Sequence, residues 1–154
     1  MRFVNKILLI SGILFIALQF IRPVHNKSSK VLPTDISKVI TVPDTVLTLL
    51  KHACYDCHSN NTDYPWYSNI QPMGWLMAYH IKQAKNQLNF SAFGSYPQRR
   101  QLSKLDGINN SIKDNIMPLK SYKIMHKSAQ LSTDEKSLLI NWAQRSIDSL
   151  STKN

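Results

Sequence analysis

Apolar side chains recur every three or four positions along much of the chain, and no segment shows sustained alternation of apolar and polar residues. The helices that this pattern predicts cover residues 41–54, 75–88, 95–115 and 131–150. The last has the clearest start, because Ser132 and Glu135 have the spacing of a capping box. Its expected buried stripe consists of Leu138, Leu139, Trp142 and Ile147. The sequence therefore predicts an all-α fold.

The two middle helices have less regular patterns. One would place along a single face Leu76, Tyr79, His80, Gln83 and Ala84. The other repeats Leu102, Leu105, Ile108 and Ile112, although Gly107 weakens the helix in its middle. Residues 63–74, which are rich in proline and aromatic residues, and residues 116–130 are expected to be loops.

The N-terminal segment has a different composition from the rest. Arg2 and Lys6 precede an apolar run from Ile7 to Ile21, which is typical of a segment that directs export. The run is short for a spanning helix, which needs about 20 apolar residues, but no small-residue cleavage site follows it. We interpret residues 1–22 as an uncleaved signal anchor that holds the protein on the periplasmic face of the inner membrane. Cleavage would instead release it into the periplasm.

The remaining chain divides into a linker and one domain. Residues 23–40 are polar and contain Pro23, Pro33 and paired serines, which predicts a polar tether. Residues 41–150 are long enough to form a single modest domain.

The chain of 154 residues has 19 lysines and arginines against 9 aspartates and glutamates, so its formal net charge is +10. This excess favours acidic partners or anionic lipid. No nucleic-acid recognition motif accompanies it, so we do not expect nucleic acid to be the partner. The sequence also offers no evident site for a small-molecule substrate.

Both cysteines of the chain lie in one short stretch, "HACYDCHSN" at residues 52–60. A redox-active dithiol would need a strand before the motif, and the pattern predicts none. A zinc site could add His52 or His80 as a fourth ligand, but no second clustered pair exists. A plain disulfide would leave His58 without a role.

Covalent haem attachment uses all three groups of this stretch. Cys54 and Cys57 can form thioethers with the two vinyl groups of one haem c, and His58 can then bind the iron as the proximal ligand. Export agrees with this interpretation, because such attachment takes place outside the bacterial cytoplasm.

From His52 to Ala143 the chain resembles the bacterial haem-binding domain family of small, c-type-cytochrome-like proteins. The matching stretches are "ACYDCHSNNTDYPWYSNIQP", "HIKQAKNQLNFSAF" and "IMPLKSYKIMHKSAQLSTDEKSLLINWA". The resemblance implies covalent haem c, a compact, cytochrome c-like helical domain and a periplasmic setting that is often membrane-anchored. It implies little about the physiological role.

The second axial ligand of the iron decides between an electron carrier and a catalyst. Met117, in a loop and followed by Pro118, is the leading candidate, with His80 and His126 as rivals and an open site as a further alternative. Aromatic residues that could wall the haem pocket are Tyr64, Trp66, Tyr67 and Trp75, and residues that could neutralise the haem propionates are Arg99 and Arg100.

These observations together predict a membrane-anchored periplasmic cytochrome with one haem, which transfers single electrons to or from an acidic redox partner. It would be an electron carrier rather than an enzyme. The alternative is a peroxidase-like enzyme or a gas or redox sensor, in which the distal site is open or weakly held.

Overall fold

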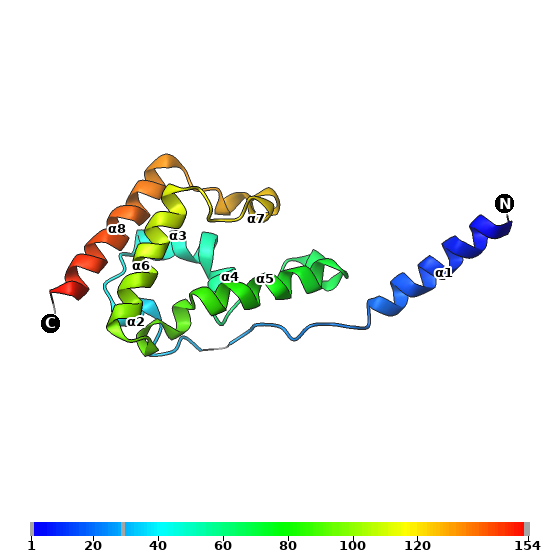
Figure 1. Cartoon of the computed structure of the whole chain (residues 1–154), viewed down its shortest axis with the longest axis horizontal. Coiled ribbons are helices and arrows are strands. Elements are labelled where there is room, and N and C mark those ends of the chain that lie inside the picture. Colours follow the sequence, from blue (N-terminus) through cyan, green and yellow to red (C-terminus); the bar gives the residue numbers. More distant parts are fainter. Residues whose placement is uncertain (1, 29, 153–154) are drawn as a thin grey trace.

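The structure is a computed structural model that describes residues 2–28 and 30–152. Every regular element in this part of the chain is helical, which confirms the all-α prediction (Figure 1). The α-helices are α1 (Arg2–Leu18), α2 (Ile36–Val39), α3 (Asp44–Leu50), α4 (Asp56–His58), α5 (Met73–Gln87), α6 (Gln98–Lys113), α7 (Lys120–Met125) and α8 (Thr133–Ser151). A π-helix, η1, covers Lys51–Tyr55, and the 3-10 turns are η2 (Trp66–Asn69), η3 (Phe90–Ser95) and η4 (Lys127–Ala129).

Helices α6 and α8 lie side by side and form the main helix pair (Figure 1). The capping box predicted at the start of α8 is present, with Ser132 N–H donating to Glu135 Oε2 at 2.7 Å. The pair closes over a buried apolar core that also includes residues of α3 and η3. Members of this core are Val46, Leu50, Phe90, Phe93, Leu105, Ile108, Ile112, Leu139, Trp142 and Ala143.

The predicted buried stripe of α8 is partly confirmed. Leu139 and Trp142 are buried, Ile147 is partly buried, and Leu138 is 36% exposed. Trp142 also donates its indole N–H to the carbonyl oxygen of Thr41 at 3.1 Å. This bond fixes the chain that enters α3 against α8.

Helix α5 is less buried than its sequence pattern predicts. Leu76 and Tyr79, expected on its inner face, are 48% and 58% exposed, and the buried positions of the helix are Gly74 and Ile81. The expected loop over residues 116–130 contains the short helix α7, in which no residue is fully buried. This side of the molecule therefore has little apolar packing of its own.

Helix α1 extends away from the other helices (Figure 1). With 17 residues and a rise of about 1.5 Å per residue, it spans roughly 26 Å, less than the ~30 Å of a bilayer core. None of the helices in the described part of the chain is long and apolar enough to cross a membrane. The predicted membrane-spanning anchor is therefore not supported.

The segment predicted to be a polar tether contacts the helical domain. Asn26 donates its side-chain amide to Ser59 O at 2.8 Å and to Thr62 Oγ1 at 2.9 Å, and it accepts a bond from Lys85. Farther along, Asp35 caps α2, and Ile36 is fully buried in the core. Asn26 thus contacts the loop that follows the cysteine motif, and Ile36 contacts the core, whereas Val24 before them and Val31 between them are exposed.

Candidate functional site

The cysteine motif lies in a nearly continuous helical segment. Helix α3 passes directly into the π-helix η1 and then into α4, so Cys54 lies about one turn before the adjacent Cys57 and His58. A π-helix widens the helical turn and is frequent at functional sites. Burial of Leu50 and Ala53 in the interior fixes the segment and turns the motif toward α5.

The imidazole of His58 is oriented by the end of α5. Its Nδ1 lies 3.0 Å from the carbonyl oxygen of Leu88, and since a carbonyl oxygen only accepts, Nδ1 carries the proton. Burial of the ring lowers the pKa of His58 from its usual value. The ring is therefore neutral near pH 7, and Nε2 keeps its lone pair for a metal ion.

Two adjoining cavities, of about 280 Å³ and 220 Å³, lie along the motif. Residues that line both are Ala53, Cys54, His58, Gln87 and Met117. The larger cavity continues along Leu88, Phe90 and one side of α6, and the smaller one continues along Cys57, His80 and Tyr122. The structure thus brings together the two cysteines, the proximal candidate and the leading distal candidate.

The three distal candidates differ in their surroundings. Met117 lines both cavities, whereas His80 lines only the smaller one. His126 lines neither: its Nε2 lies 2.8 Å from the hydroxyl of Tyr67, and its ring stacks on Tyr122. Met117 and His80 therefore both border a cavity beside the cysteine motif, whereas His126 does not.

A hydrogen bond ties α7 to the middle of the cysteine motif. Tyr122 donates its hydroxyl to Oδ2 of Asp56 at 2.5 Å, and Asp56 Oδ1 accepts the backbone N–H of Asp63 at 2.9 Å. Because Tyr122 also lines the smaller cavity, this bond holds α7 against that cavity.

The four aromatic residues expected to wall the pocket lie elsewhere, and none of them lines either cavity. Tyr64 accepts a bond from Asn26 N–H, Trp66 is 73% exposed, and Trp75 donates its indole N–H to Ile21 O. Tyr67 contacts His126.

The arginines expected to neutralise propionates also lie outside both cavities. The guanidinium carbon of Arg100 sits over the ring of Tyr96, 4.5 Å from its centroid, and Arg99 is exposed. In their place the structure adds residues that the sequence analysis did not assign to the site. These wall residues include Phe90, Lys104, Gly107 and Ser111.

The two thiols have the wrong electrostatics for a reactive dithiol. Both cysteines are free, and burial raises the pKa of Cys54 to about 12 and that of Cys57 to about 11. Reactive dithiols need a lowered thiol pKa, because the thiolate is the nucleophile. The zinc alternative gains no support either, since no cluster of three potential metal ligands occurs among the described residues.

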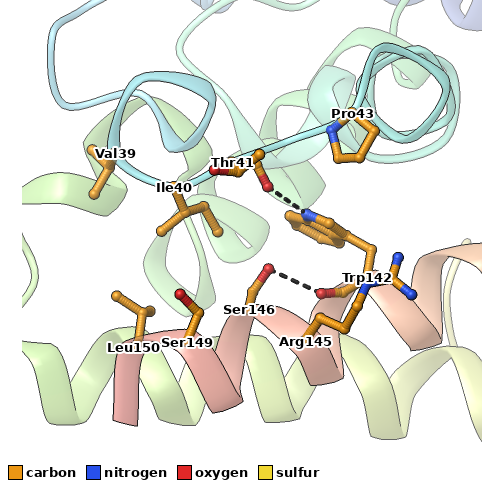
Figure 2. A pocket seen from close by; sticks show the side chains of 9 residues that line it. All are labelled: Val39, Ile40, Thr41, Pro43, Trp142, Arg145, Ser146, Ser149 and Leu150. Atoms are coloured by element: carbon orange, nitrogen blue, oxygen red, sulfur yellow. Dashed lines mark hydrogen bonds between the residues drawn. The ribbon is translucent and has the colours of Figure 1, made fainter. Parts of the chain in front are cut away.

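A separate cleft of about 220 Å³ lies between residues 39–43 and α8 (Figure 2). It contains the Trp142–Thr41 bond, and Ser146 donates its hydroxyl to the carbonyl oxygen of Trp142. None of the candidate ligands lines it. The candidate site is therefore the pair of cavities beside the cysteine motif.

Comparison with known protein families supplies independent information. The family model described as the haem-binding domain matches residues 13–145. No curated protein and no solved structure matches the chain. The matched region includes every candidate ligand and both cavities.

Proposed function

The chain belongs to the haem-binding domain family, and from this premise we propose that it carries one covalent haem c and transfers single electrons. The observation that carries the proposal is the setting of His58. Its Nδ1 is bonded to Leu88 O at 3.0 Å, and it lines the same two cavities as Cys54 and Met117.

The residues of the two cavities fit a haem. Their walls are mostly apolar, as a macrocycle requires, and Gly107 leaves open space, because a Cβ placed there would meet no atom within 4 Å. Cys54 and Cys57 would hold the group as thioethers, His58 would bind the iron through Nε2, and Met117 would be the second axial ligand. When bound, the haem supplies a one-electron iron couple.

The protein residues around these ligands serve to hold them. The Leu88 carbonyl keeps the His58 ring in one orientation and one tautomer. Because its Nδ1–H is hydrogen-bonded, Nε2 would donate its lone pair to the iron more strongly. The Tyr122–Asp56 bond keeps α7 against the motif, beside the smaller cavity. Both effects suit an electron carrier, whose ligands should move little.

Location and partner form part of the proposal. Arg2, Lys6 and the apolar residues of α1 have the character of an export signal, which would place the domain in the periplasm, with the signal retained or cleaved. The net charge of +10 would direct the protein to an acidic redox partner, and this attraction would weaken with salt.

The test is an absorption spectrum of the full chain, produced together with cytochrome c maturation machinery, followed by a haem stain after denaturing electrophoresis. We expect a c-type spectrum and a stained band, and the double variant Cys54→Ala/Cys57→Ala should lose the stained band. A wild-type chain without covalent haem, or a double variant that keeps it, contradicts the proposal.

The alternative function is an enzyme or sensor that binds a small ligand at the iron. The observation in its favour is that His80, Gln83 and Tyr122 bring polar groups to the smaller cavity, next to Met117. Carbon monoxide distinguishes the two functions. A ferrous protein that ignores carbon monoxide until Met117→Ala opens the site supports the carrier, and rapid binding by the wild type supports the alternative.

A further inference from the structure

We propose that Lys104 forms an ion pair with a haem carboxylate, and that the face of α6 formed by Lys104, Gly107 and Ser111 is the wall against which the carboxylate-bearing side of the haem lies. This inference rests on the proposed function. It assigns the counter-ion of the haem carboxylate to Lys104, which lies on the same helix as Arg99 and Arg100 but, unlike them, lines the cavity.

Helix α6 has two different faces. Leu105 and Asn109 are buried and do not line the cavity, and the helix packs against α8. Lys104, Gly107 and Ser111 follow one another at intervals of three and four residues, so they share one side of the helix. All three line the larger cavity, whose other wall includes Cys54 and His58. The cavity therefore separates this side of α6 from the cysteine motif.

The small side chains on this face make room for a ligand. A Cβ at Gly107 would meet no atom within 4 Å, and Ser111 is the next residue on the same side. Glycine in the middle of a helix costs about 0.5–1 kcal/mol relative to alanine. The presence of Gly107 inside α6 is explained if a bound group occupies the space beside it.

The charge on this face matches the chemistry of a haem. The vinyl groups occupy one side of the porphyrin and the two carboxylates the opposite side, so attachment at Cys54 directs the carboxylates away from the cysteine motif. A carboxylate at a partly buried site needs a charged hydrogen-bond donor. Of the described residues that line the two cavities, Lys104 is the only lysine or arginine, and it is partly buried.

The test is a thermodynamic cycle on the full chain in its haem-free, reduced form. Iron protoporphyrin IX and its dimethyl ester, which has no free carboxylate, are titrated into the wild type and into Lys104→Met, Lys104→Arg and the control Arg99→Met. Arg99→Met removes the same charge from an exposed position of the same helix. Circular dichroism of each haem-free variant checks that α6 is intact.

We expect Lys104→Met to weaken binding of iron protoporphyrin IX about two- to fivefold, because Lys104 is only partly buried and solvent screens its ion pair, and to leave binding of the dimethyl ester unchanged. Lys104→Arg should retain most of the affinity, and Arg99→Met should match the wild type. In the covalently loaded protein, Lys104→Met should lower the reduction potential more than Arg99→Met, because a nearby positive charge disfavours ferric iron.

Two results overturn the inference alone: equal loss for both porphyrins, which would make Lys104 a packing residue, or no loss for either. A wild type that binds neither porphyrin contradicts the proposed function as well, and the absence of the stained band described above identifies that case separately.

Discussion

The two sides of this molecule are held together in different ways. On one side, α6 and α8 bury a continuous apolar core that contains Leu105, Leu139 and Trp142. On the other side, α5 buries only Gly74 and Ile81, and α7 buries no residue. Contacts there are mainly polar, such as the bonds of His58 with Leu88 and of Tyr122 with Asp56.

This difference indicates which side of the molecule is stable without haem. The α6–α8 side can fold by burying its own apolar surface, whereas the side formed by α5 and α7 lacks enough apolar area to pack tightly alone. A bound macrocycle between the two sides would supply the missing contacts. The weakly packed side is thus the side that we expect to respond most to haem.

The largest expected effect breaks the apolar side. Trp142→Ala should lower the free energy of unfolding of the haem-free chain by about 3–5 kcal/mol, because it removes a buried ring and the bond to Thr41. Urea denaturation measures the change. Trp142→Phe should cost clearly less, since most of the apolar area remains. A small loss for Trp142→Ala would mean that the α6–α8 core does not dominate stability.

The next effect tests whether the other side depends on polar contacts. Tyr122→Phe should lower the free energy of unfolding of the haem-free chain by about 1.5–3 kcal/mol, the usual range for a hydrogen bond to a charged group. Tyr79→Phe is the matched control, because Tyr79 lies on the same side and is 58% exposed. If both variants unfold alike, the Tyr122–Asp56 bond does not hold α7 in place.

Alkaline pH should also weaken the polar side. Burial, together with the nearby carboxylates, raises the pKa of Tyr55 and of Tyr122. Above the unfolded-state pKa of about 10, the unfolded chain loses these protons before the folded chain does, so stability falls as pH rises.

The slope of this fall cannot exceed about 1.4 kcal/mol per pH unit for each tyrosine, because each releases one proton, and solvent screening of the partly exposed rings limits the total loss. Urea midpoints between pH 8 and 11 measure it. The double variant Tyr55→Phe/Tyr122→Phe should show a flatter profile than the wild type, and an unchanged profile would contradict the assignment.

The sequence predicted the apolar side better than the polar side, for a physical reason. Ser132 and Glu135 act through local hydrogen bonds, and Leu105, Ile108 and Ile112 repeat with the period of a helix, so a single segment carries the information. Tyr64, Trp66 and Trp75 were expected beside the haem because of their chemistry alone. In the structure Tyr64 bonds to Asn26, Trp75 bonds to Ile21 and Trp66 is exposed to solvent. These surroundings depend on how segments distant in the sequence pack together.

The same distinction applies to the candidate site. Spacing alone brought Cys54, Cys57 and His58 together, because all three lie within two helical turns. The carbonyl of Leu88 and the cavity face of α6 could not be predicted, because a backbone acceptor has no residue signature and a glycine such as Gly107 is read from sequence only as weakening a helix. Gly107, which weakened the prediction of a helix, is a residue that borders the larger cavity.

The smallest expected effect sharpens the comparison within a single helix. Gly107→Ala should raise the free energy of unfolding of the haem-free chain by about 0.5–1 kcal/mol, because alanine favours the helix and its Cβ meets no atom within 4 Å. Gly107→Phe should leave the α6–α8 core intact but place a ring in the cavity, so that its haem content, measured by pyridine haemochrome, falls well below that of Gly107→Ala. Since α6 faces the core on one side and the cavity on the other, stability and haem content should change in opposite directions at this position. Full haem content in Gly107→Phe would show that the haem does not occupy the larger cavity, and α6 would then belong to the apolar side alone.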